Sequence, residues 1–154
     1  MNINPQETAF IFPGQGSQAL GMGKALSEKY TIARQTFDEA DAILGFFLSR
    51  LMWGDDVDAL NDTLNTQPAL FVHSLAALRV LNEIAPGFKP ASFAGHSLGE
   101  LSALAAAGAL AVLRLVTDHS ARKLRRQRCA LGLLAWFGWG NRGIDGFQLR
   151  LDGG

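Results

Sequence analysis

A serine between two glycines is the first place in this chain where residue type and spacing could do chemistry. Gly95-His96-Ser97-Leu98-Gly99 fits the pattern G-x-S-x-G, in which a serine on a tight strand-to-helix turn exposes its hydroxyl as a nucleophile. The two glycines are needed because the turn crowds the neighbouring backbone. The pattern predicts that Ser97 attacks a thioester, and that the backbone N–H of Leu98 helps to stabilise the oxyanion.

The same five residues have a simpler interpretation. A chain with 17 glycines can contain this pattern by chance, and Ser97 would then only cap the next helix. The apolar Ser92-Phe93-Ala94 before the turn and the alanine-rich run Glu100–Ala107 after it favour catalysis, since the motif requires a strand and then a helix. His96 is adjacent to Ser97 in the chain and is unsuited to be its base, so we expect a local structural or substrate-facing role for it.

A second glycine-rich segment follows an apolar run near the N-terminus. Ala9–Phe12 predicts a buried strand, which leads into a loop over Gly14–Gly23. Gly14-x-Gly16-x-x-Ala19 also fits a dinucleotide-binding fingerprint, but the acidic residues about 20 positions on lie in a helical pattern and not at a strand end. A P-loop is excluded because no Gly-Lys-[Ser/Thr] follows. The loop is interpreted as a source of backbone N–H donors beside the nucleophile, with a plain structural turn as the alternative.

The elements around these motifs alternate between strand and helix. Apolar spacing predicts helices over about Lys24–Tyr30, Ile32–Leu44 and Pro68–Ile84, the last beginning at a proline, whose fixed φ suits a first helical position. Strands and helices in alternation, with crossovers of the parallel type, indicate an α/β fold.

Composition narrows the class of protein. The chain has 154 residues, 48% hydrophobic and 18% charged, which fits one globular domain with a hydrophobic core. The single cysteine, Cys129, cannot form an internal disulfide, and Met1–Pro5 lacks the basic start and apolar run of a signal peptide. We therefore expect a reducing, cytoplasmic setting and no transmembrane segment.

Three segments together carry a family resemblance: Phe12–Gln18 (FPGQGSQ), Asn65–Leu70 (NTQPAL) and Ala94–Glu100 (AGHSLGE). Their sequence, order and spacing resemble malonyl-CoA:acyl carrier protein transacylases over about residues 7–118. The acyltransferase domains of polyketide and animal-type fatty-acid synthases are similar. The resemblance implies the large acyltransferase subdomain, with an α/β-hydrolase-like core of parallel strands.

The resemblance also implies a ping-pong reaction in fatty-acid or polyketide synthesis. The serine takes malonyl from malonyl-CoA as an ester, and the phosphopantetheine thiol of acyl carrier protein then collects it, with no metal and no redox cofactor. Ser97 matches the nucleophile, and the N–H groups of Gln15 and Leu98 match the oxyanion hole. Gln67 matches a polar residue that lines the site, and His96 is expected to face the substrate.

The resemblance ends near residue 118. His119 stands where the family places an arginine that pairs with the malonyl carboxylate, so this chain lacks a bidentate clamp at that position. The family's catalytic histidine follows a small ferredoxin-like subdomain, and we expect both to be absent here. His73 lies on an apolar helix and is expected to be a core or boundary residue, which leaves no histidine suited to be the general base.

Residues 119–154 differ from everything before them. They hold 7 Lys and Arg against 2 Asp and Glu, whereas residues 1–118 hold 7 against 12. A basic run, Lys123–Arg128, precedes the apolar Cys129–Gly140. A membrane-surface segment and a nucleic-acid patch are alternatives, but we favour a translated frameshift or truncated gene, with no nucleic-acid partner and poor packing against the rest.

The sequence therefore predicts a partial acyltransferase α/β domain over residues 1–118 and a divergent tail over residues 119–154. Its expected activity is malonyl transfer, impaired by the missing half. Three alternatives stay open: a polyketide-synthase-type acyltransferase of other acyl specificity, a non-catalytic remnant that binds acyl carrier protein, and a serine hydrolase.

Overall fold

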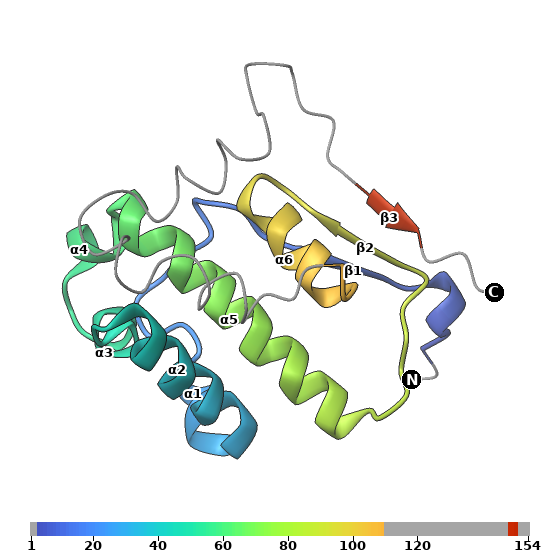
Figure 1. The fold of residues 1–154 in the computed structure, drawn as a ribbon, viewed down its shortest axis with the longest axis horizontal. Coiled ribbons are helices and arrows are strands. Elements are labelled where there is room, and N and C mark those ends of the chain that lie inside the picture. The colour runs from blue at the N-terminus through green and yellow to red at the C-terminus, as the bar shows by residue number, and fades with distance from the viewer. Residues whose placement is uncertain (1–2, 110–147, 151–154) are drawn as a thin grey trace.

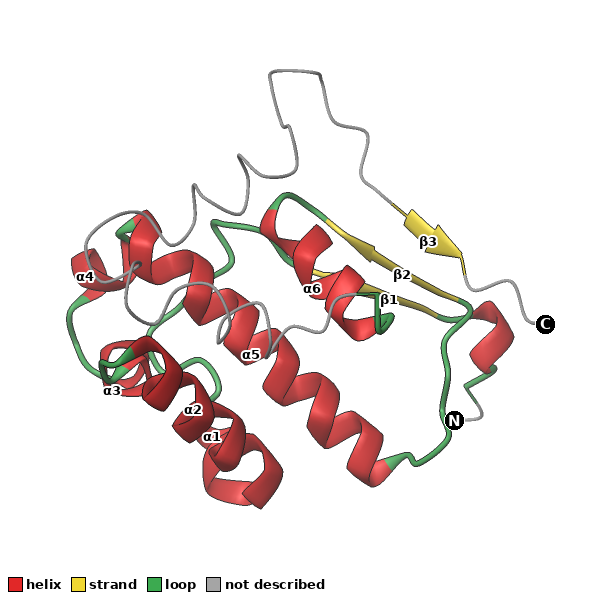
Figure 2. Ribbon diagram, in the orientation of Figure 1, coloured by secondary structure: helices red, strands yellow, loops and turns green. Residues whose placement is uncertain are grey.

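The computed structural model describes residues 3–109 and 148–150 of the chain. In this part, two parallel strands are linked by a run of helices, and a sixth helix follows the second strand (Figures 1 and 2). The elements are η1 (Pro5–Glu7), β1 (Ala9–Phe12), α1 (Lys24–Lys29), α2 (Thr31–Leu44), α3 (Leu48–Trp53), α4 (Val57–Asn61), α5 (Thr63–Ile84), β2 (Ser92–Gly95), α6 (Leu98–Ala106) and β3 (Gln148–Arg150).

The pairing of β1 with β2 confirms the predicted α/β class. The strands are parallel, with Ala9 opposite Ser92 and Phe12 opposite Gly95. The backbone of β3 pairs antiparallel with the other edge of β2. Except for β3, the predicted tail over residues 119–154 lies outside the described residues. The parallel register places the carboxyl ends of β1 and β2, where both glycine motifs begin, at the same edge of the sheet.

The sheet is covered on one face by α6, which also contacts α5 (Figure 2). Phe10, Phe12 and Phe93 pack together, with the rings of Phe10 and Phe93 edge to face at 5.8 Å. Ile11 points the other way and is 78% exposed, so the prediction that β1 is buried was wrong for half of its residues. The reason is geometric: alternate residues of a strand face opposite sides, and α6 shields only one of them.

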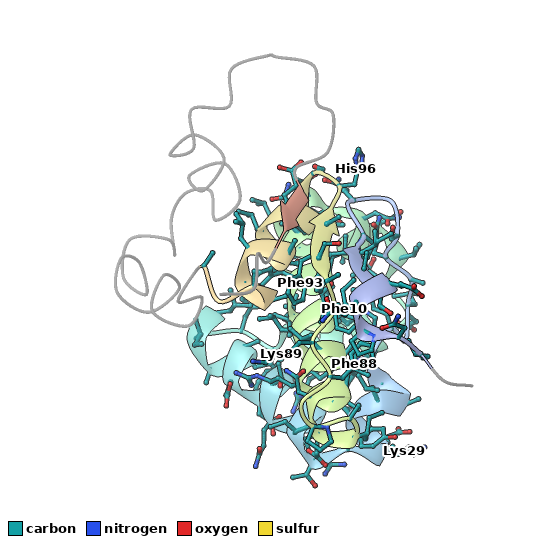
Figure 3. The ribbon with its side chains drawn as sticks, turned by 90° about the vertical axis from the view of Figure 1, so that its right-hand side faces the viewer. Phe10, Lys29, Phe88, Lys89, Phe93 and His96 are labelled. Carbon is teal, nitrogen blue, oxygen red and sulfur yellow. The ribbon has the colours of Figure 1, made fainter. Side chains whose placement is uncertain are left out.

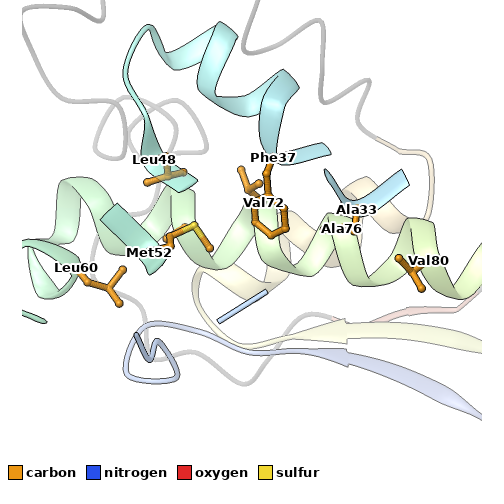
Figure 4. Packing of buried hydrophobic residues seen from close by; sticks show 9 residues of the cluster. Ala33, Phe37, Leu48, Met52, Leu60, Val72, Ala76 and Val80 are labelled. Carbon is orange, nitrogen blue, oxygen red and sulfur yellow. The ribbon is translucent and has the colours of Figure 1, made fainter. Parts of the chain in front are cut away.

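The main core lies between α5 and the helices that precede it (Figure 4). Phe37 of α2 packs edge to face on Trp53, whose Nε1–H donates to the carbonyl of Met22 at 3.0 Å. Met52 and Leu60 are fully buried against α5. This cluster fixes α5, and α5 in turn supports α6 beneath the sheet.

The predicted helices are present, with one substantial correction. α1 and α2 agree with prediction to within one residue, whereas α5 begins at Thr63 and contains Pro68 in its interior. The side chain of Asp62 caps α5 by accepting the N–H of Leu64 at 2.9 Å, which starts the helix ahead of the proline. Because Pro68 has no N–H, α5 loses only the helical hydrogen bond to the carbonyl of residue 64, which lies in its first turn. Among the helices in the described ranges, none combines the length and the hydropathy that a membrane crossing requires.

Candidate functional site

Ser97 occupies a strained turn between β2 and α6. Its backbone has φ 54° and ψ −116°, and it is the one non-glycine residue of the described ranges with positive φ. Such a conformation costs about 1–3 kcal/mol and persists only where the surroundings enforce it. Ser97 is exposed, and α6 begins at the next residue. The predicted order of strand, sharp turn and helix is therefore present.

Close backbone packing enforces the turn. A Cβ on Gly95 would lie 2.1 Å from the carbonyl of Gly99, and a Cβ on Gly99 would lie 2.1 Å from the carbonyl oxygen of Phe12. A Cβ on Gly14 would lie 2.5 Å from the carbonyl oxygen of His96. These three positions have no room for any side chain, which explains the glycines at each of them. They also show that the first glycine motif lies directly against the second.

The hydroxyl of Ser97 is not used to cap α6. Ser97 stands at the N-cap position, where a serine usually accepts an N–H from the first helical turn, yet its side chain makes no such bond. A capping role was the simpler explanation of this serine in the sequence. The geometry removes that explanation and leaves an exposed hydroxyl at the positive end of a helix.

The loop after β1 contributes backbone donors. The N–H of Gly16 is taken by Oε1 of Gln18 at 2.8 Å, and that of Ser17 by the carbonyl of Gly14 at 3.4 Å. Within residues 3–109 and 148–150, no acceptor takes the N–H of Gln15. Leu98 is the first residue of α6, where an N–H has no acceptor inside the helix. Among the described residues, no acceptor therefore occupies either of the two predicted oxyanion donors.

The side chain of Gln15 connects the loop to α5. Its Nε2 donates to Oγ1 of Thr63 at 3.1 Å, and Gln18 similarly reaches Asn61 at 2.8 Å. Gln67 lies four residues after Thr63 on the same helix, so the two side chains share one face of α5. Gln67 is half-buried. Gln15 and Gln67, both predicted to be site residues, are therefore brought to the same end of α5, since Gln15 binds Thr63 and Gln67 shares a helix face with Thr63.

Two of the three histidines lie in the described residues, and they differ in environment. His96 is exposed at the carboxyl end of β2, and its Cδ2 lies 3.2 Å from where a Cβ of Gly14 would be (Figure 3). His73 lies on α5 and packs beside Gly23, which precedes α1, and burial lowers the pKa of His73. A half-buried position agrees with the prediction of a boundary residue. His119 lies outside the described residues.

Glu100 is a residue of the site that the sequence interpretation did not assign. It lies at the third position of α6, and its Oε1 is enclosed without a hydrogen-bond partner among the described residues. The S-x-x-E spacing of Ser97 and Glu100, typical of a capping box, was the available signal.

Two other kinds of site receive no support. Two of the three acidic residues that a dinucleotide site could have used are engaged within the helical layer: Glu39 pairs with Arg79 at 2.8 Å, and Asp41 accepts the N–H of Ser49 at 3.0 Å. In the part of the chain that the structure describes, no three His, Cys, Asp or Glu side chains gather closely enough to hold a metal ion.

Residues 9–126 match the acyl transferase domain family, and the chain belongs to that family. The malonyl CoA-acyl carrier protein transacylase of Bacillus subtilis (strain 168) is 53% identical over 102 residues, which cover 66% of this chain and 32% of that protein. An acyl carrier protein S-malonyltransferase from Vibrio cholerae superposes with a TM-score of 0.66 at 46% identity, over 70% of this chain and 35% of that one.

A solved complex of a type II PKS acyl-carrier protein with its malonyl-transacylase contains a chain that superposes with a TM-score of 0.65 at 46% identity. The match covers 70% of this chain and 36% of the matched chain. This chain therefore spans about a third of the length of each of these three relatives.

Proposed function

We propose that this chain carries the nucleophile and the oxyanion donors of a malonyl-CoA:acyl carrier protein transacylase. Ser97 is the nucleophile, the N–H groups of Gln15 and Leu98 form the oxyanion hole, and Gln67 and His96 face the substrate. One observation carries this proposal: Ser97 has a strained backbone, its side chain does not cap α6, and its turn packs through Gly95 and Gly99 against the end of β1. The proposed substrate, malonyl-CoA, and the proposed partner, acyl carrier protein, are inferred from the names of the relatives.

The reaction proceeds in two balanced steps. The Oγ of Ser97 attacks the thioester carbonyl of malonyl-CoA, the oxyanion binds the two N–H groups, and coenzyme A leaves as a thiol that gains the serine proton. The phosphopantetheine thiol of acyl carrier protein then attacks the carbonyl of the seryl ester, a malonyl thioester forms as the bond to Ser97 breaks, and the thiol proton returns to the serine oxygen.

Proton transfer is the weak part of this site. His96 adjoins Ser97 in the chain, and His73 packs beside Gly23, so neither is assigned as the base. General-base assistance is typically worth about 10²–10⁴-fold, so we expect slow acylation and poor onward transfer. We further propose that the described core is the α/β-hydrolase-like part of the large subdomain of a cytoplasmic protein. Residues 119–154 are proposed to be a divergent tail.

Intact-protein mass spectrometry after incubation with malonyl-CoA tests this function, alongside a malonyl-transfer assay with acyl carrier protein. Slow addition of one malonyl group, lost in Ser97→Ala, is expected. Rapid transfer that depends on Ser97 would contradict the impaired state. Labelling that survives Ser97→Ala would overturn the nucleophile, and hydrolysis of simple esters without malonyl transfer would favour a serine hydrolase.

A further inference from the structure

Residues 15–20, called here the glutamine loop, carry the proposed oxyanion donor Gln15 and have a loosely held backbone. Gly16 has a φ of 103°, which glycine adopts readily and other residues rarely do. Within the described ranges, the backbone of the glutamine loop bonds only to the surrounding turn and to no other element; the N–H of Ser17, for example, donates to the carbonyl of Gly14 at 3.4 Å. Backbone bonds alone would leave this segment free to sample several conformations.

Two side chains of the glutamine loop join it to the corner between α4 and α5. Nε2 of Gln15 donates to Oγ1 of Thr63 at 3.1 Å, and Nε2 of Gln18 donates to Oδ1 of Asn61 at 2.8 Å. The Oε1 of Gln18 accepts the N–H of Gly16 at 2.8 Å, so this amide bridges the loop backbone and α4. Among the described residues, these side chains make the hydrogen bonds that connect the glutamine loop to another element.

The corner that receives these bonds is fixed in the core. Asn61 is the last residue of α4 and Thr63 the first residue of α5, with Asp62 between them as the cap of both helices. Just beneath the corner, the hydroxyl of Thr66 donates to the carbonyl of Leu60 at 2.6 Å, and both of these residues are fully buried. The corner therefore presents two acceptors in fixed positions to a loop that its own backbone bonds hold only weakly.

The two anchors act where the proposed donor lies. The bond to Thr63 holds the residue that carries the donor N–H, and the bridge through Gln18 holds the N–H of the next residue, Gly16. Removing one oxyanion donor typically lowers a rate by about 10²–10³-fold, and such a donor acts only when it is held in its productive position. A loop that kept the donor in place about a tenth of the time would lose about tenfold in rate.

We propose that Asn61 and Thr63 are positioning residues for the oxyanion hole: they anchor the glutamine loop through Gln18 and Gln15 and so hold the Gln15 N–H in one place. This inference rests on the proposed function, in which that N–H stabilises the oxyanion formed at Ser97. It assigns to Asn61 and Thr63 no contact with substrate and no proton transfer.

Two matched pairs of variants separate this role from helix stability. Thr63→Val removes the acceptor and keeps the shape of the side chain, whereas Thr63→Ser keeps the hydroxyl. Asn61→Ala removes the other acceptor, whereas Asn61→Asp keeps an oxygen that can accept from Gln18. Asp56→Ala is the control, because the Asp56 side chain caps α4 by accepting the N–H of Ala59 at 2.8 Å and, among the described residues, makes no bond to the glutamine loop.

A fluorophosphonate measures the reactivity of Ser97: its Oγ bonds to phosphorus, fluoride leaves, and the hydroxyl proton passes to solvent. In the double variant Asn61→Ala/Thr63→Val, the maximal labelling rate should fall at least about tenfold. The probe concentration that gives half of that rate should change by less than about twofold, because an oxyanion donor acts in the transition state. The double variant Asn61→Asp/Thr63→Ser should label within about threefold of wild type.

The control decides between positioning and stability. Asp56→Ala should lower the unfolding temperature at least as much as Asn61→Ala/Thr63→Val and leave labelling of Ser97 unchanged. Equal labelling of that double variant and wild type would overturn the proposal. An equal loss of labelling in Asp56→Ala would also overturn it, because a weakened α4 alone would then explain the effect.

Backbone amide relaxation, measured by NMR on the full chain, tests the anchoring without any reaction. The order parameters of Gly16 and Ser17 should lie near about 0.85 in wild type, as for rigid backbone, and fall toward about 0.6 in Asn61→Ala/Thr63→Val. Unchanged order parameters in that variant overturn the proposal. If wild type does not label, or labelling survives Ser97→Ala, the nucleophile assignment fails, and the order parameters still decide whether Asn61 and Thr63 hold the loop.

Discussion

Gly99→Ala is the sharpest test of how the two glycine motifs are held together. A Cβ at this position would meet the Phe12 carbonyl oxygen at 2.1 Å, the Phe12 carbonyl carbon at 2.8 Å and the Pro13 oxygen at 2.9 Å. Ordinary contact begins near 3.4 Å, so the shortest separation must open by 3.4 − 2.1 = 1.3 Å. All three atoms belong to backbone, and no side chain can move aside to provide that space.

The cost follows from that geometry. Overpacking in a core typically costs about 1–3 kcal/mol, and a clash with backbone belongs at the upper end, so we expect a loss of about 3 kcal/mol. Gly87→Ala is the matched control, because Gly87 has φ +84° and a Cβ added there would meet nothing within 4 Å. That variant carries only the left-handed strain, about 1–2 kcal/mol, partly offset by reduced freedom of the unfolded chain.

Urea unfolding and Ser97 labelling measure the two consequences together. Gly99→Ala should lower the unfolding free energy by about 2 kcal/mol more than Gly87→Ala. It should also slow labelling of Ser97 in the folded protein, because separating α6 from the end of β1 moves the proposed oxyanion donors apart. If the two alanine variants matched in stability and in labelling, the close packing of the motifs would be refuted.

Three further predictions concern the layer that supports the site. Met52→Ala should lose about 2–5 kcal/mol by denaturant unfolding, since Met52 is fully buried, whereas Leu64→Ala at a half-exposed position should change stability by less than about 1 kcal/mol. Asp62→Ala should cost about 1 kcal/mol through the lost cap of α5, measured as a fall in unfolding temperature. Because burial lowers the folded pKa of His73, the unfolded chain binds the extra proton more readily, so stability falls as pH drops below about 6.5. His73→Gln should flatten that part of the pH profile, and an unchanged profile would contradict the buried neutral imidazole.

The elements nearest the motifs were predictable because their signals are local. An apolar run ended by Pro13-Gly14 marks β1, and Gly108 with φ +74° closes α6 just after its alanine-rich run. The start of α5 was misplaced because Pro68 suits a first helical turn, while the true signal was the weaker N-cap of Asp62. α3 and α4, of six and five residues, were not predicted, although α1, also of six residues, was; helices this short show little of the helical period.

The site was only partly predictable. Ser97 and its flanking glycines follow from spacing, and the expectation that the Gly14 loop lies nearby came from the need for oxyanion donors. The contact of Gly14 with His96 depends on the parallel register of β1 and β2, which 79 intervening residues conceal in the sequence. The exposure of Ile11 also depends on distant parts of the chain, because it is the packing of α6 that decides which face of β1 is covered.

The described part of the site separates the positioning of the proposed nucleophile, Ser97, from proton transfer. Ser97, the N–H of Leu98 and the N–H of Gln15 are features of two turns whose shape is fixed by the β1–β2 pairing and by the glycine contacts. A general base, in contrast, is a side chain that must approach the hydroxyl from outside those turns. Such packing can hold a strained serine ready for attack without any base, since backbone contacts and not proton transfer enforce its conformation. The positioning of Ser97 and the transfer of its proton should therefore fail independently. Gly99→Ala should disturb the positioning, and an added base should alter only the proton transfer.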